Sequence, residues 1–138
     1  MTTALPCLAA AALVFATLAA AAPADPLARH RWSERLLVVS APDPGDARLA
    51  AQRRIVEASQ AEARERDLVL VEAVGPGAEA AAIRKKLGLP ADGFRAVLVG
   101  KDGGAKLVSP EPIAAARLFE TIDAMPMRRE EARRRPGR

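Results

Sequence analysis

Five polar residues that could form a binding site lie in one loop and in the helical segment after it. They are Asp43, Asp46, Arg48, Gln52 and Arg53. Arginines beside the free amides of a helix N-terminus can bind a carboxylate or a phosphate, so these residues could form a small anion pocket. The alternative is structural. Gln52 falls on the apolar side of the helix, where its amide must bond to a strand-end carbonyl or a loop amide.

A second set of charged residues closes the chain. Residues 128–138 hold six arginines and two glutamates, a net charge of +4 that equals the formal charge of the whole protein. The rest of the chain is therefore neutral. Such a tail can attract an anionic surface or an acidic protein, or it can be a solvated terminus without a role. The candidate interaction residues are Arg128, Arg129, Arg133, Arg134 and Arg135.

The residue types that the chain lacks exclude several kinds of site. There is one cysteine, one histidine and no tyrosine, and the cysteine, Cys7, lies in an N-terminal apolar segment. Once that segment is removed, the chain can form neither a disulfide nor a thiol active site, and we expect no metal and no other cofactor. Nucleic-acid binding is disfavoured because no aromatic residues alternate with the basic ones.

The N-terminal segment is typical of an export signal. Residues 8–22 are small and apolar except for Thr17, and Ala22-Pro23-Ala24 offers a cleavage site after Ala24. The stretch is shorter than the roughly 20 residues that a membrane-spanning helix needs. If the apolar run is counted from Ala4 it becomes long enough for the alternative, a retained anchor. We expect a signal peptide at 1–24 and a periplasmic or secreted protein.

The remaining chain alternates short apolar runs with segments of helical periodicity. Runs bounded by Pro and Gly predict four strands. These strands span 36–40, 67–74, 94–100 and 105–108. Apolar residues at helical spacing predict three helices, the first capped by Asp43 or Asp46. These helices span 46–66, 78–87 and 109–125. Asp102-Gly103 predicts a hairpin turn between the last two strands and not a phosphate loop.

The resulting order, β-α-β-α-β-β-α, predicts an α/β protein with a mixed four-stranded sheet between two layers of helices. A helical crossover makes the first two strands parallel, and the tight turn makes the last two antiparallel. This is the order of the thioredoxin fold, whose redox cysteines occupy the loop after the first strand. Here that loop, 40–46, contains no cysteine, so thiol–disulfide exchange is excluded. We expect Trp32 to pack over one end of the sheet.

Five sequence blocks resemble an uncharacterised thioredoxin-like domain family. The blocks are Trp32-x-x-Arg35-Leu-Leu-Val-Val, Asp46-Ala-Arg48-Leu-x-x-Gln52-Arg53, Arg66-Asp-Leu-Val-Leu-Val-Glu72, Val97-Leu-Val-Gly-Lys-Asp-Gly-Gly104 and Ile122-Asp-Ala-Met-Pro-Met-Arg-Arg-x-Glu. This family occurs in exported bacterial proteins and in animal sushi-repeat-containing extracellular proteins. The resemblance implies an extracytoplasmic module without redox cysteines, and it brings no catalytic residues to assign.

Together these observations predict an exported, thioredoxin-like binding module of unknown ligand that is not a catalyst. Its expected parts are a signal peptide at 1–24, a linker at 25–31, the domain at 32–127 and a flexible basic tail at 128–138. The expected partner is an envelope or extracellular protein, or an anionic surface reached through the tail. Two alternatives stay open: an enzyme of unknown class acting at loop 41–48, and a structural protein of an envelope complex.

Overall fold

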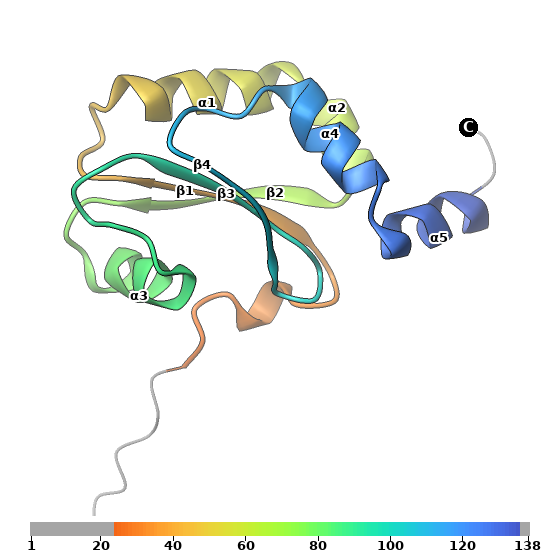
Figure 1. Ribbon diagram of the computed structural model, residues 1–138, viewed down its shortest axis with the longest axis horizontal. Helices are drawn as coiled ribbons and strands as arrows, with labels where there is room; N and C mark the ends of the chain where they lie inside the picture. Colours follow the sequence, from red (N-terminus) through yellow and green to blue (C-terminus); the bar gives the residue numbers. More distant parts are fainter. Residues whose placement is uncertain (1–23, 136–138) are drawn as a thin grey trace, which may run out of the picture.

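In the computed structural model, which describes residues 24–135, helices lie on both faces of a four-stranded sheet (Figure 1). The strands are β1 (Arg35–Ala41), β2 (Leu68–Val74), β3 (Arg95–Val99) and β4 (Ala105–Ser109), in the spatial order β2-β1-β3-β4. β1 and β2 are parallel, whereas β3 is antiparallel to both β1 and β4. The prediction of a mixed four-stranded sheet in an α/β protein is confirmed.

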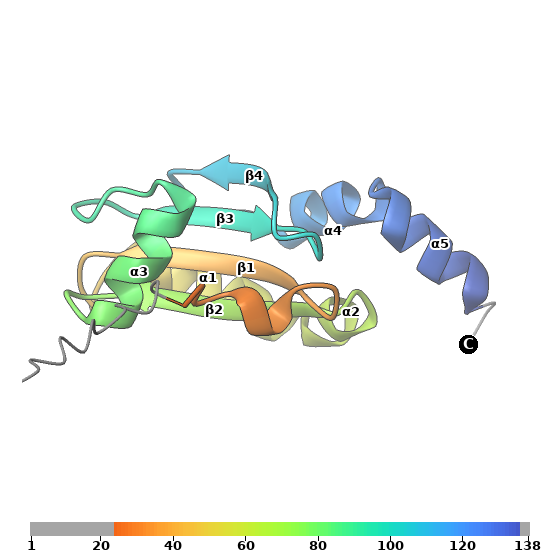
Figure 2. The same ribbon diagram turned by 90° about the horizontal axis from the view of Figure 1, so that it is seen from below.

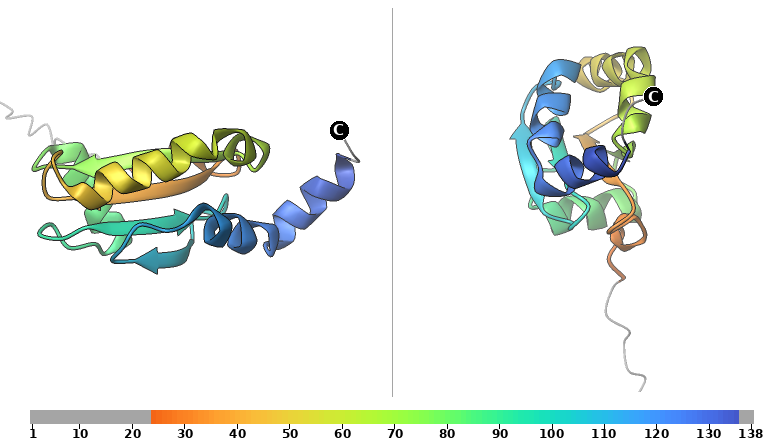
Figure 3. Two further views of the ribbon diagram at one scale, coloured as in Figure 1. Left: turned by 90° about the horizontal axis from the view of Figure 1, so that it is seen from above. Right: turned by 90° about the vertical axis from the view of Figure 1, so that its right-hand side faces the viewer.

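Among the described residues, one 3-10 turn and five α-helices complete the fold. They are η1 (Ala28–His30), α1 (Ala47–Ala58), α2 (Gln60–Glu65), α3 (Ala78–Leu87), α4 (Ala115–Asp123) and α5 (Pro126–Arg134). α1, α2 and α4 cover one face of the sheet, and α3 and η1 cover the other (Figures 1 and 2). α5 extends beyond the end of the sheet at which β1 and β2 begin (Figure 3).

The central strand β1 supplies the core on both sides of the sheet. Successive residues of a strand point to opposite faces. Leu37 and Val39 accordingly pack beneath α1, α2 and α4, whereas Leu36 and Val38 pack against α3. All seven residues of β1 are buried. This burial on both faces explains why the strand reads as a continuous apolar run and not as an alternating one.

The segment expected to form one helix over 46–66 forms two. α1 ends at Ala58, and Ser59 has non-helical backbone angles of φ −116° and ψ 28°. The Ser59 hydroxyl donates a hydrogen bond to the carbonyl oxygen of Ile55 at 2.7 Å. Serine hydroxyls that bond to the preceding turn in this way weaken the helix locally. The chain resumes as α2, whose Ala63 is buried against the sheet.

The C-terminal part of the chain differs most from expectation. The helix predicted from Ser109 begins only at Ala115, because the segment before it turns Ile113 into the core. The expected flexible tail from Arg128 begins inside helix α5. Pro126 suits the first turn of a helix, and Arg128 is buried. A run of charges was therefore not a sufficient sign of a solvated terminus.

The N-terminal part also differs. Residues 25–31, expected to be a linker, pack on the body: Leu27 is buried, and Asp25 accepts a hydrogen bond from Lys86 at 2.6 Å. Trp32 does not cover the sheet, since it is 64% exposed. The predicted signal peptide lies outside the described residues except for Ala24. No helix within 24–135 is both long and apolar enough to cross a membrane.

Candidate functional site

The aspartates of the predicted anion pocket bond to the loop and to the helix that follow them. Asp43 Oδ1 accepts a hydrogen bond from the Gly45 amide at 2.7 Å. Asp46 Oδ1 accepts from the amides of Arg48 and Leu49 at 2.8 and 3.4 Å, so Asp46 is the N-cap of α1. The helix amides that would bind an anion are therefore already bonded to a carboxylate of the protein.

Gln52 has the partners that its structural alternative requires. It is fully buried, and its Nε2 donates to the carbonyl oxygen of Ile113 at 3.0 Å. The Ile113 amide donates in return to Gln52 Oε1 at 2.7 Å. One side chain thus satisfies both backbone groups of a residue in the segment before α4. This pair of bonds fastens that segment to α1.

The two remaining residues of the predicted pocket also have partners in the protein. Arg53 donates to both carboxylate oxygens of Glu72 at 2.6 Å, and this bond holds the pKa of Glu72 below its usual range. Arg48 lies over the ring of Phe94, 5.8 Å from its centre. Arg48 Nε also lies 3.7 Å from Asp46 Oδ1, whereas Arg53 pairs with Glu72 of β2 and Gln52 with Ile113, so the structure does not bring all five predicted residues together.

A buried arginine that the sequence analysis missed closes the same end of the sheet from the other face. Arg84 of α3 donates from Nε to the Ser40 hydroxyl at 2.9 Å. Its terminal nitrogens donate to the carbonyl oxygens of Ala41 and Ala73 at 2.9 Å and of Gly75 at 2.8 Å. These neutral partners are the carboxyl ends of β1 and β2. Arg84 lies four residues after Ala80 and three before Leu87, so helical periodicity would have placed it on the buried face of α3, unlike Lys85.

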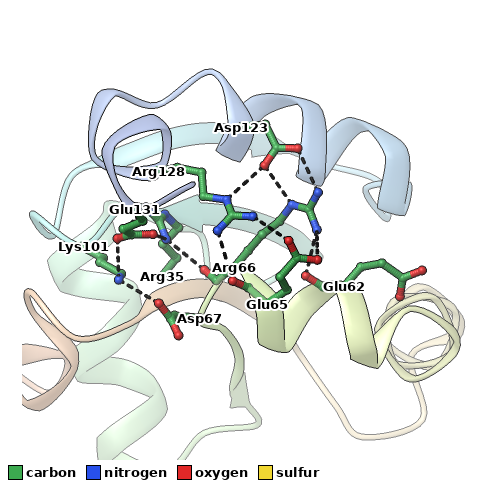
Figure 4. Close-up of polar contacts among 9 residues, drawn as sticks. All are labelled: Arg35, Glu62, Glu65, Arg66, Asp67, Lys101, Asp123, Arg128 and Glu131. Atoms are coloured by element: carbon green, nitrogen blue, oxygen red, sulfur yellow. Dashed lines mark hydrogen bonds and ion pairs between the residues drawn. The ribbon is translucent and has the colours of Figure 1, made fainter. Parts of the chain in front are cut away.

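A cluster of charges lies at the opposite end of the sheet, where α5 meets the body (Figure 4). Lys101 Nζ contacts carboxylate oxygens of Asp67 at 2.9 Å and of Glu131 at 2.7 Å. Arg35, which is 1% exposed, donates to Glu131 at 3.1 and 3.3 Å and to the carbonyl oxygen of Arg66 at 2.9 Å. Glu131 therefore inserts between two cations of the body.

The second half of the cluster joins α5 to α2 and α4. Arg66 donates to both carboxylate oxygens of Asp123 at 2.9 Å, and Arg128 donates to one of them at 3.3 Å (Figure 4). Arg128 also donates to Glu65 Oε1 at 3.0 Å. The bond from Arg66, followed by that from Arg128, lowers the pKa of Asp123. Arg128, predicted to contact a partner, is thus committed to the fold.

The other predicted tail residues are exposed on α5 and just after it. Arg133 and Arg134 lie 3.2 and 3.6 Å from carboxylate oxygens of Glu130. Arg129 and Arg135 are also exposed. These arginines lie at the end of the sheet opposite loop 41–48, so the two predicted sites do not meet. Within residues 24–135, no three His, Cys, Asp or Glu side chains gather as metal ligands.

Replacing Gln52 by leucine is expected to destabilise the fold without affecting any anion binding. The variant leaves the amide and carbonyl of Ile113 without partners in the core, which we expect to lower the free energy of unfolding by about 3 kcal/mol. Urea denaturation measures the change, and Gln60→Leu on exposed α2 is the control. An anion pocket would be supported instead if phosphate stabilised the natural protein but not the Gln52→Leu variant.

The Glu131→Gln variant tests whether charge holds α5 in place. Burial raises the pKa of Glu131, but hydrogen bonds from Lys101 and Arg35 outweigh it, so the pKa lies below its ordinary value of 4.5. A lowered folded-state pKa adds stability above the ordinary value, which is lost as the pH falls through the folded-state value. At neutral pH we expect Glu131→Gln to lower the free energy of unfolding by about 2 kcal/mol.

Denaturation of both proteins from about pH 6 to about pH 3 should show this difference shrinking as the carboxylate of the natural protein is protonated. The matched control is Glu130→Gln, which removes an exposed neighbouring carboxylate and is expected to change stability by less than about 0.5 kcal/mol. Equal effects of the two variants, or a difference that persists at low pH, would contradict the role assigned to Glu131.

No solved structure matches this chain. Residues 26–131 match a protein family that is described only as a domain of unknown function, DUF4174. The match runs from the segment before η1 to Glu131, the residue that α5 inserts between Arg35 and Lys101. The expectation of an uncharacterised domain family is confirmed to that extent. The chain belongs to the DUF4174 family.

Proposed function

We propose that this protein is an exported, thioredoxin-like binding module that recognises an anionic surface through the outer side of α5. The strand order and directions support the thioredoxin-like arrangement, because a parallel β1–β2 pair is joined to an antiparallel β3–β4 hairpin. The distribution of the helices supports it too, with α1 and α4 on one face and α3 on the other.

The bonding of the polar groups at one end of the sheet favours binding over catalysis. This is the end at which thioredoxin-like proteins carry their reactive cysteines. The corresponding loop, 40–46, has no thiol. The carboxylates of its two aspartates accept hydrogen bonds from backbone amides. Arg84 donates hydrogen bonds to the carbonyl oxygens at the ends of β1 and β2. A catalytic site requires a nucleophile, a base or a metal that is free to contact a substrate. The groups at this end are used to hold the loop and the strands together.

The observation that carries the proposal is the sorting of charges on α5. Arg128 and Glu131 point into the body and form the ion pairs that fix the helix. The exposed charges that remain up to residue 135 are four arginines, opposed by Glu130 alone. The arginines are Arg129, Arg133, Arg134 and Arg135. Arg129 and Arg133 are four residues apart and lie on the same side of the docked helix, and Arg134 and Arg135 follow them at its end. Guanidinium groups pair well with phosphates and carboxylates.

An α5 variant with the substitutions Arg129→Gln, Arg133→Gln and Arg134→Gln is expected to lose binding to anionic vesicles. Each basic residue near such a surface contributes about 1 kcal/mol, so three should weaken binding by about 100-fold. Sedimentation with mixed phosphatidylcholine and phosphatidylglycerol vesicles measures the effect, and vesicles of phosphatidylcholine alone are the reference. Added salt should release the natural protein.

The matched control removes the same charge from other helices. Arg54, Arg64 and Arg117 are exposed on α1, α2 and α4, and their replacement by glutamine lowers the net charge by the same amount. This control should retain most of the binding. Equal losses in the two triple variants would mean that net charge alone matters, and the absence of binding by the natural protein would refute the proposal.

Export, the other part of the proposal, is supported by the apolar residues 8–22 and by the small residues Ala22 and Ala24 around the expected cleavage site. Expressed in a bacterial host, the chain should reach the periplasmic fraction and begin at Asp25 by mass spectrometry. Ala24→Leu should block cleavage, whereas Ala9→Leu in the apolar run should not. An intact chain starting at Met1 in the cytoplasmic fraction would contradict export.

A further inference from the structure

A pocket of about 320 Å³ lies between the β3–β4 turn and the junction of α4 with α5. Residues 124–127 form an apolar wall, and the charged residues at its lining are Arg35, Lys101, Asp102 and Lys106. Small-molecule sites usually have volumes of about 300–1,000 Å³ and mostly apolar walls with a few polar groups. This pocket therefore has the size and the lining of a site for a small ligand.

The charged lining favours an anion, since three of its four charged residues are cationic. Arg35 and Lys101 are committed to Glu131. Lys106 is available, because its only carboxylate partner within the described chain is Asp102 at 2.9 Å, and both side chains are partly exposed, at 36% and 45%. An exposed pair of this kind is worth less than about 1 kcal/mol, so a ligand carboxylate can replace Asp102 at little cost.

Asp102 can release Lys106 without losing all of its hydrogen bonds. Its Oδ1 accepts from the Gly104 amide at 3.0 Å, a bond within the β3–β4 turn that does not involve the lysine. The turn therefore does not depend on the Lys106–Asp102 pair. Lys106 lies on β4, which is an edge strand of the sheet. Its ammonium group can change partners while the strand pairing stays intact.

Arg35 provides an independent observation at the same pocket. Its Nε is the one buried side-chain nitrogen or oxygen in the described part of the chain without a hydrogen-bond partner. Buried polar groups are nearly always paired, so the guanidinium at this wall has donor capacity that the protein leaves unused. A second cation with incomplete bonding therefore adds to the positive character of the pocket lining.

We propose that the pocket binds a small amphipathic carboxylate. Its apolar chain packs against residues 124–127, where two methionines provide flexible side chains that adapt to an unbranched ligand. Its carboxylate pairs with Lys106 at the mouth of the pocket. This site does not use the exposed arginines of α5, so it and the proposed function can fail independently.

The test is titration of the purified chain with octanoate, followed by calorimetry and by amide chemical shifts. We expect saturable binding, with the largest shifts in residues 104–106 and 124–127. Octylamine has the same chain with the opposite charge, and acetate has the carboxylate without the chain. Both should bind at least about tenfold more weakly, because each lacks one half of the interaction.

Lys106→Gln removes the ammonium group that is proposed to pair with the carboxylate of octanoate. Because the position is exposed, the fold should be unaffected, and octanoate binding should weaken by about tenfold or more. Lys85→Gln on exposed α3 removes the same charge elsewhere and should leave binding within about twofold. The α5 triple arginine variant should bind octanoate like the natural protein. Absent binding, equal binding of octylamine, or an unchanged affinity of Lys106→Gln would overturn the proposal.

Discussion

Lys101 joins three parts of the chain at the end of the sheet where β1 and β2 begin. Its carbonyl oxygen accepts from the Trp32 amide at 2.7 Å, and its ammonium group bonds to Asp67 and Glu131. Trp32 and Asp67 lead into β1 and β2 with left-handed φ values of 68° and 51°. Such values are costly for residues other than glycine and persist only where surrounding contacts enforce them. Lys101 therefore connects the starts of two strands and α5 at one point, through its backbone carbonyl and its ammonium group.

The two ends of the sheet use buried arginines in different ways. At the carboxyl ends of β1 and β2, Arg84 bonds to carbonyls and a hydroxyl and fills the space beside loop 41–48. At the other end, Arg35 bonds to a carboxylate supplied by α5 and keeps one donor unpaired. The first arrangement completes the backbone bonding of the protein. The second leaves a pocket and a surface rich in arginine beside it.

Local patterns predicted the parts of the fold that local physics determines. The helix expected over 78–87 has those bounds, since Gly88 ends it with φ +66°. The Asp102-Gly103 turn and the four strands were likewise readable from the sequence. Long-range pairs were not: Gln52 was recognised as a polar residue on an apolar face, but its partner, Ile113, lies 61 residues away. Glu131 and Arg35 are 96 residues apart, so nothing local indicated that α5 would dock.

Burial separates two uses of the same chemistry in α5. The inward Arg35–Glu131 pair is shielded, with side-chain exposures of 1% and 22%, and salt screens such a pair much less than an exposed one. The outward arginines, such as Arg133 at 74% exposure, feel the full ionic strength of the medium. As the salt concentration rises, we therefore expect α5 to stay docked on the body while an anionic partner dissociates from its exposed arginines. The degree of burial of each charge on α5 therefore decides whether salt weakens its interactions.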